Sequence, residues 1–172
     1  MSLTTKKSVQ KERLKSSIDS GGSSVGKLIQ KKPKLRYAIG IDVGIINGFS
    51  IWDRQLEKLE VVTSCKLFEL FIEIQDWQNK TVEDIEVFIE NPNTWKPFTK
   101  PNPSEQQGAG AVKQTYKHIV EFLEFKQIQF TPTKIQGNLK KLNRATFEKY
   151  TKWSKVTNEH ARDSAMIVFG RK

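Results

Sequence analysis

The sequence predicts an α/β domain with a five-stranded mixed sheet flanked by helices, and the order of its segments is what predicts it. Three short strand-like runs follow one another before any helical segment, which is typical of an antiparallel meander. From there on, helical and strand-like segments alternate, which is typical of α/β domains. The 172 residues suffice for one domain with its own core.

Five segments have the composition of strands. Residues 36–44 (RYAIGIDVG) form a short apolar run typical of a buried strand. Residues 47–53 (NGFSIWD) follow after two residues and alternate in polarity, which predicts a hairpin partner. The third strand of the meander is predicted at 59–67. Later strands are predicted at 85–90, which is mostly apolar and expected near the centre of the sheet, and at 128–133.

Two helices are expected between these strands. The first is predicted at 68–80, because its apolar residues recur at helical spacing. Those residues are Leu70, Phe71, Ile74 and Trp77. Residues 91–110 are rich in proline and contain glycine, so we expect a loop there. The second helix is predicted over 109–126, where apolar residues again share one helical face.

The last part of the chain is expected to form a loop and two further helices. Residues 134–144 read as a basic loop, and 145–155 as a short helix. The final helix is predicted over 158–170. Asn158 is expected to cap its N-terminus and Gly170 its C-terminus, since these residue types favour those positions.

Residues 1–34 differ from the rest of the chain in charge. They hold nine Lys or Arg and two acidic residues, a net charge of +7, whereas the remaining 20 basic and 17 acidic residues give +3. With their serine and glycine content they predict a disordered arm, which leaves 35–172 as the folded domain. Contact with a phosphate backbone and a solubilising or targeting role both fit such an arm.

Composition excludes several classes of protein. No apolar run approaches the roughly 20 residues that span a membrane, and the basic arm lacks the apolar core of a secretory signal. Cys65 is the only cysteine, which excludes an internal disulfide and a cysteine-rich zinc site. A single cysteine fits a reducing compartment. We therefore expect a cytoplasmic protein, with organellar targeting by the basic arm as the alternative.

Three carboxylates and a histidine stand at the ends of apolar segments. Asp42 lies at the end of the first predicted strand, in GIDVG, and Glu90 is the last residue of the fourth. His160 and Asp163 lie three residues apart, which places them on one face of the final helix. If the first and fourth strands are neighbours, Asp42 and Glu90 meet at one edge of the sheet. A helix packed across that edge would add His160 and Asp163 to them.

Such a cluster predicts a site for cations, because crowded carboxylates repel one another. Oxygen ligands favour Mg²⁺ or Mn²⁺ over zinc. Two such ions about 3.5–4 Å apart can flank a scissile phosphate and activate water. Taken singly, each residue has an ordinary explanation: a turn residue, a strand end, a helix-dipole partner and a packed or exposed imidazole. Their joint occurrence favours a metal site for phosphodiester hydrolysis.

The motifs around these residues resemble those of the RuvC-like Holliday-junction resolvases, a family of the ribonuclease H-like superfamily. The resemblance covers 36–170, and its segments in chain order are GIDVGIINGFSIWD, VFIENP, QGAGAVKQTYKHIVEFL, FTPTKIQGNLKK and HARDSA. It implies that Asp42, Glu90 and Asp163 bind metal, and that His160 binds metal or assists the attacking water.

The resemblance also implies a reaction and its partners. A member of this family is a homodimer that binds four-way DNA junctions and nicks two strands symmetrically in a Mg²⁺-dependent reaction. It would act as a nucleoid-associated or phage-encoded protein, with no membrane and no small-molecule substrate.

A second set of residues is expected to contact DNA. Aromatic and basic residues are interspersed in the loop after Glu90, which suits stacking on exposed bases and pairing with phosphates. These loop residues are Trp95, Lys96, Phe98 and Lys100. Basic residues elsewhere are expected to contact phosphates; they are Lys113, Lys134, Lys140, Lys141 and Arg144. The alternatives are that Trp95 packs under its own loop and that the basic residues form a solvated face.

Two other functions fit the same residues. A ribonuclease H-like nuclease for other branched DNA or for RNA–DNA hybrids would use the same site chemistry. Dimerisation and a preference for branched DNA separate a resolvase from it. A non-catalytic junction-binding protein would carry the fold with a relic site, and the intact set of four residues argues against that. An actin-like ATP-binding protein needs two such domains, for which 172 residues are too few.

Overall fold

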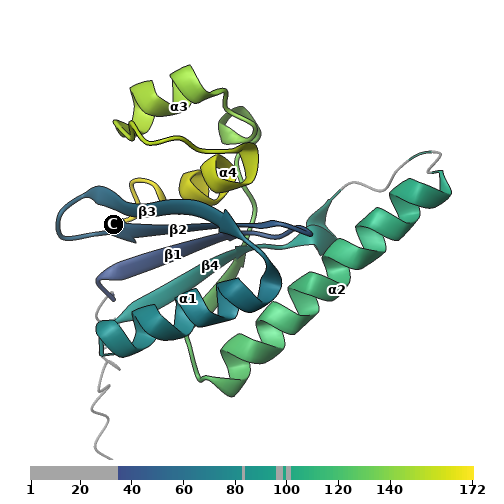
Figure 1. Cartoon of the computed structure of the whole chain (residues 1–172), viewed down its shortest axis with the longest axis horizontal. Helices are drawn as coiled ribbons and strands as arrows, with labels where there is room; N and C mark the ends of the chain where they lie inside the picture. Colours follow the sequence, from purple (N-terminus) through teal and green to yellow (C-terminus); the bar gives the residue numbers. More distant parts are fainter. Residues whose placement is uncertain (1–34, 83, 96–98, 100–101) are drawn as a thin grey trace, which may run out of the picture. The chain divides into compact units, whose positions relative to one another are not determined.

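The predicted order of strands and helices is confirmed in the computed structural model, which describes residues 35–82, 84–95, 99 and 102–172. Five strands form one sheet in the order β3-β2-β1-β4-β5 (Figure 1). The strands are β1 (Tyr37–Asp42), β2 (Asn47–Asp53), β3 (Lys58–Cys65), β4 (Ile85–Glu90) and β5 (Phe130–Thr133). The first three pair as an antiparallel meander, whereas β4 runs parallel to both β1 and β5. The protein is therefore an α/β protein with a mixed sheet.

Helices cover both faces of this sheet (Figure 1). They are α1 (Leu67–Lys80), α2 (Pro103–Phe125), α3 (Arg144–Thr151) and α4 (Glu159–Val168), with short 3₁₀ turns η1 (Pro92–Thr94) and η2 (Gly137–Leu139). One face carries α1 and α2, and the opposite face carries α4, with α3 outside it. Among the described residues, no helix combines the length and the apolar character needed to cross a membrane.

The alternation of side chains along the strands separates two cores. Successive strand residues point to opposite faces, so Ile39 and Ile41 of β1 pack with α1 and α2, while Ala38 packs with α4. The same alternation directs Asp42 toward the face of α4. On β4, Glu90 shares that face with Phe88, which packs in the α4 core. Strand period alone thus brings both carboxylates to one side of the sheet.

Glycines on β1 and β2 allow α4 to approach the sheet backbone directly. A Cβ added to Gly40 would overlap the carbonyl oxygen of Ser164, and one added to Gly48 would overlap that of His160. The two glycines, together with the small residue Ser50 that pairs with Gly40 in the sheet, leave space for the backbone of α4. This contact fixes the height of α4 above the sheet, and with it the depth at which its side chains reach the strand ends.

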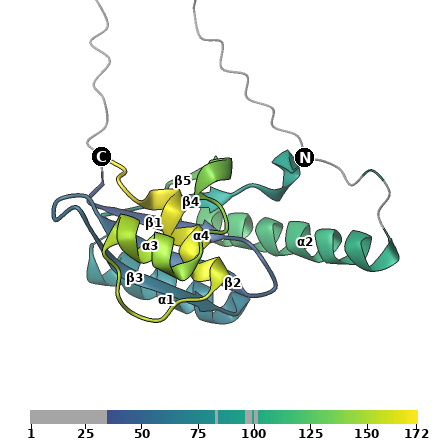
Figure 2. The same cartoon turned by 90° about the horizontal axis from the view of Figure 1, so that it is seen from above.

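The second helix corrects one prediction. We expected a loop over 91–110, but α2 begins at Pro103, six residues before the predicted start. Asn102 caps the helix by accepting a hydrogen bond from the N–H of Glu105, whose own side chain accepts from the N–H of Asn102 at 3.0 Å. Proline fits the first helical position because the backbone N–H that it lacks would have no acceptor within the helix there. The exposed first turns of α2 project past the sheet (Figure 2).

The predicted ends of the final helix are confirmed with a small shift. The Asn158 side chain accepts a hydrogen bond from the N–H of Ala161 at 2.9 Å, as expected of an N-cap. The helix ends at Val168, and Gly170 follows the cap residue with a φ of 72°, a backbone conformation that favours glycine. The disordered arm predicted at 1–34 lies outside the described residues and stays a prediction.

Replacing Gly48 by alanine should destabilise the protein, because the new methyl group must push α4 away from β2. Overpacking of this kind typically costs about 1–3 kcal/mol. A Cβ added to Gly110, in the exposed part of α2, meets no atom within 4 Å outside the neighbouring backbone of its own helix. Gly110→Ala should therefore stabilise the helix by about 0.5–1 kcal/mol. Urea denaturation of both variants measures this difference. Equal effects of the two changes would contradict the close-approach argument.

Candidate active site

Two neighbouring parallel strands end in buried carboxylates. Asp42 is the last residue of β1 and Glu90 the last of β4, and the two strands pair in register up to Ile41 and Ile89. The two residues are only 5% and 2% exposed. The sequence prediction that these carboxylates meet at one edge of the sheet is therefore confirmed in geometry.

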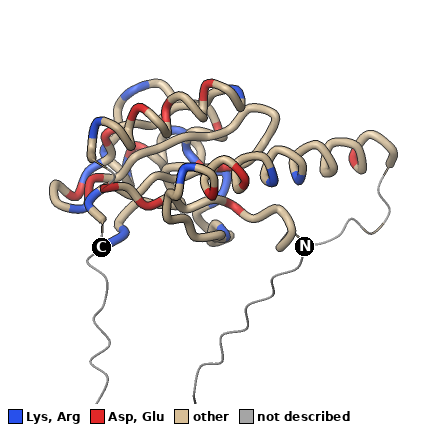
Figure 3. Tube along the Cα trace, turned by 90° about the horizontal axis from the view of Figure 1, so that it is seen from below, with Lys and Arg blue, Asp and Glu red and all other residues tan. Residues whose placement is uncertain are grey.

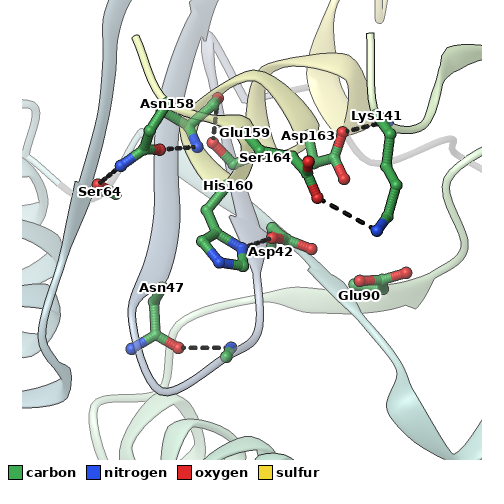
Figure 4. A network of polar contacts seen from close by, with 12 residues as sticks. Asp42, Asn47, Ser64, Glu90, Lys141, Asn158, Glu159, His160, Asp163 and Ser164 are labelled. Atoms are coloured by element: carbon green, nitrogen blue, oxygen red, sulfur yellow. Dashed lines mark hydrogen bonds and ion pairs between the residues drawn. The ribbon is translucent and has the colours of Figure 1, made fainter.

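The final helix brings the other two predicted residues to the same place (Figure 4). The His160 ring lies with Nδ1 2.9 Å from Oδ2 of Asp42. Asp163 is 2% exposed, and its Oδ1 accepts the backbone N–H of Lys141 at 2.7 Å. In Figure 4 the side chains of Asp42, Asp163 and Glu90 point toward a common space between α4 and the end of β4. Asp42, Glu90, His160 and Asp163 are called the acidic cluster below.

The electrostatics of the acidic cluster disfavour full ionisation. Burial raises the pKa of Asp42 from 3.8 to about 9, aided by the neighbouring carboxyl group of Glu90 and by the negative charges of Glu90 and Asp163. Burial is also the largest cause of the raised pKa of Asp163, which the N–H of Lys141 opposes. Oε2 of Glu90 is buried and has no hydrogen-bond partner. A buried carboxylate oxygen left without a donor is costly, so the cluster is short of positive charge.

One lysine supplies part of that charge. Nζ of Lys140 lies 2.6 Å from Oε1 of Glu90. The indole of Trp95 is placed beside both groups, because its Nε1 donates to Oε1 of Glu90 at 3.4 Å and its ring centre lies 5.4 Å from Nζ of Lys140. Trp95 is therefore half-buried against the acidic cluster, and its contacts reach beyond its own loop.

The donor set fits a hard divalent cation. Carboxylate oxygens with one imidazole nitrogen are ligands that Mg²⁺ and Mn²⁺ accept, and Oε2 of Glu90 is a buried acceptor that such an ion would satisfy. In the arrangement described, each carboxylate already contacts a polar group of the protein. Within the described part of the chain, no three His, Cys, Asp or Glu side chains are spaced to share one ion. Side-chain rearrangement would have to accompany ion binding.

The other residues predicted to contact DNA lie at several separate places in the structure. Lys140 lies in the cluster, whereas Lys141 and Arg144 pair with nearby glutamates at 3.3 and 2.5 Å. Lys134 and Lys113 are exposed, and Lys113 lies on α2. Three further predicted residues fall outside the described residues; they are Lys96, Phe98 and Lys100. Basic and acidic positions are interspersed along the described trace (Figure 3). Several of the basic side chains form ion pairs with acidic ones.

Sequence reasoning missed the residue that shapes the turn beside His160. Asn47 is fully buried, and its Oδ1 accepts the N–H of Gly44 at 3.2 Å, which closes the turn between β1 and β2. A Cβ on Gly44 would contact Cε1 of the His160 ring. The signal was present in the sequence, because asparagine side chains commonly hydrogen-bond to backbone groups in turns.

Comparison with known proteins does not assign this protein to a family. No protein-family model matches the sequence, and a search of curated proteins finds no significant match. The function proposed below therefore depends on the arrangement of the residues themselves and on the resemblance of their motifs.

The raised pKa of Asp42 predicts how stability depends on pH in a chelating buffer. Between pH 3.8 and about 9 the folded protein holds a proton on Asp42 that the unfolded chain has lost. Stability should therefore fall as pH rises through this window, by at most about 1.4 kcal/mol per pH unit. Asp42→Asn removes this contribution, so urea denaturation from pH 5 to 9 should give a flatter profile for the variant. Parallel profiles for the two proteins would rule out a raised pKa.

Proposed function

We propose that this protein is a Mg²⁺-dependent, ribonuclease H-like nuclease that resolves four-way DNA junctions by paired, symmetric nicks. One observation carries the proposal: β1, β4 and α4, which are far apart in sequence, place three buried carboxylates and a histidine around one space at the edge of the sheet. This arrangement costs stability through charge repulsion and burial, and a role in binding cations explains why it is kept.

The fold supports the same proposal. The resemblance predicts a five-stranded mixed sheet flanked by helices, and the observed sheet has that composition. The condition under which Asp42 and Glu90 meet at one edge, that the first and fourth strands are neighbours, is also met. The ribonuclease H-like assignment thus agrees with the fold class, the neighbouring strands and the positions of the motif residues.

The acidic cluster can be assigned roles from its contacts. Asp42, Glu90, His160 and Asp163 would hold one or two Mg²⁺ or Mn²⁺ ions, which when bound polarise a phosphate and activate water. His160 is oriented through Nδ1 by Asp42, which leaves Nε2 to bind an ion or to take a proton from the attacking water. The side chain of His160 is 47% exposed, so its ring is accessible from solvent to a phosphodiester.

The surroundings of the cluster suit a nucleic acid. Trp95 offers an aromatic face beside the carboxylates, and bases stack on such faces with about 1–3 kcal/mol per base. Lys140, Lys141 and Lys134 lie on the segment that follows β5 and can contact phosphates. Symmetric nicking of two strands requires two active sites, so the proposal includes a homodimer.

The experiment that tests this function uses a labelled four-way junction, a duplex and a single strand, each with Mg²⁺ or with chelator. Paired symmetric nicks in the junction alone, dependent on Mg²⁺, support the proposal. Cutting of other branched DNA or of an RNA–DNA hybrid in preference to the junction would favour the broader nuclease. Junction binding without cutting would favour a non-catalytic binding protein.

Neutralising the carboxylates should abolish cleavage without abolishing binding. Asp42→Asn, Glu90→Gln and Asp163→Asn each remove a ligand charge, and each should lower the cleavage rate by about 100-fold or more. Junction affinity in chelator should persist in Asp42→Asn, because the raised pKa of Asp42 already keeps that carboxyl neutral. It should persist or rise in the other two variants, where repulsion toward phosphate is reduced. Gel-shift titrations in chelator and single-turnover cleavage in Mg²⁺ separate the two effects. A wild-type cleavage rate in any of the three variants would falsify the site assignment.

Removing the indole of Trp95 should affect junctions more than plain duplex. Trp95→Ala deletes a face on which an unpaired base at the junction can stack, and should weaken junction cleavage about tenfold while duplex affinity changes little. Trp95→Phe retains an aromatic face and serves as the matched control, with an effect of intermediate size. Equal losses on junction and duplex would point to a general contact instead.

A further inference from the structure

The ammonium group of Lys140 provides the positive charge beside the buried carboxylate of Glu90. Its Nζ lies 2.6 Å from Oε1 of a carboxylate whose side chain is only 3% exposed, while the Lys140 side chain itself is 32% exposed. The pair is therefore asymmetric: Glu90 is fixed at a strand end, and the lysine reaches in from a loop at the surface. The second carboxylate oxygen, Oε2, remains buried without a partner.

The backbone around Lys140 directs this contact. Leu139 and Leu142 pack against the α4 core on either side of the lysine pair. Lys141 has a φ of 58°, a left-handed conformation that is unusual for a residue with a side chain. At this residue the chain turns so that the Lys140 ammonium meets Glu90 while the N–H of Lys141 meets Asp163. Unfavourable backbone geometry of this kind is retained where the surrounding contacts stabilise it.

We propose that Lys140 is a displaceable counter-ion of the acidic cluster. Its ammonium neutralises Glu90 in the metal-free protein, gives up Glu90 when a divalent cation binds, and is then available to a phosphate of the nucleic acid. The first two steps concern the metal and this chain alone, whereas the last step rests on the proposed nuclease function.

Geometry favours exchange over a permanent structural ion pair. A permanent buried pair is favourable only when hydrogen bonds satisfy the remaining lone pairs, and Oε2 of Glu90 has none. The lysine also has room to leave, because its stem is partly exposed and its nearest aromatic neighbour, Trp95, is only half-buried. A unit positive charge beside a carboxylate lowers the affinity of that carboxylate for any other cation, so Lys140 must compete with the metal.

The competition is measured by Mn²⁺ calorimetry on the full chain without nucleic acid. Lys140→Gln should bind Mn²⁺ about tenfold more tightly than the wild type, which corresponds to about 1.4 kcal/mol. Lys141→Gln is the matched control: it removes the same charge from the next residue, whose ammonium pairs with Glu159 at 3.3 Å and not with Glu90, and it should change Mn²⁺ affinity less than about twofold. Lys140→Arg keeps the positive charge and should keep the wild-type affinity.

Displacement itself has an optical signature at Trp95. The ammonium lies 5.4 Å from the centre of that ring, so its departure should change the indole emission when Mg²⁺ is added. The signal is obtained as the difference between the wild type and Trp95→Phe, which removes the contributions of the other three tryptophans. Lys140→Gln should lose the Mg²⁺-dependent part of this signal, whereas Lys141→Gln should keep it.

The last step is tested with Ca²⁺ in place of Mg²⁺ and a labelled four-way junction. Ca²⁺ should increase junction affinity more in the wild type than in Lys140→Gln. Only in the wild type does the bound ion free the Lys140 ammonium from Glu90, so that it can contact a phosphate. The two proposals can fail separately. If Lys140→Gln binds Mn²⁺ more tightly but the wild type cleaves no DNA, the counter-ion role of Lys140 holds and the nuclease function is refuted. If the wild type cleaves junctions but Lys140→Gln has an unchanged Mn²⁺ affinity, the nuclease function holds and the counter-ion role is refuted. A failure of Mn²⁺ to bind any of these proteins would overturn the counter-ion and the metal site together.

Discussion

The candidate site depends on the direct contact between the backbone of α4 and the backbone of two strands. Gly40 and Gly48 leave no side chain between the helix and the sheet, so the carbonyls of Ser164 and His160 occupy space that a Cβ would otherwise fill. Helices that pack on sheets through side chains lie farther away. This short separation places a histidine in the first turn of α4 within hydrogen-bond distance of Asp42 at the end of β1.

That close packing concentrates negative charge in a place where water is scarce. Asp42, Glu90 and Asp163 are each no more than 5% exposed, and their positions follow from elements that also build the two cores. The protein offsets the repulsion locally, with an imidazole on Asp42, an ammonium on Glu90 and a backbone N–H on Asp163. Each of these groups contacts one oxygen of its carboxylate, which leaves the second oxygen available to a further cation.

Most of the fold and the acidic cluster could be predicted from the sequence, because both depend on local period. Alternation along β1 and β4 places Asp42 and Glu90 on one face, and helical spacing places His160 with Asp163. The proline and glycine content of 91–110 favours a loop, whereas Asn102 and Glu105 form a capping pair that begins α2 within that segment. The inward direction of Lys140 could not be predicted, since it depends on the left-handed backbone of the next residue and on tertiary packing.

The resulting site combines fixed and adjustable parts. The carboxylates stand on strand ends and on a helix whose distance from the sheet is set by backbone contact, so their positions change little without unfolding the core. The lysine that neutralises Glu90 stands on a loop, with a long flexible stem and partial exposure. A cluster of this kind can fold without metal, because a side-chain cation lowers its electrostatic cost. In the proposed binding of a metal ion, this lysine leaves Glu90 and the carboxylate side chains rotate toward the ion, while the backbone beneath them stays in place.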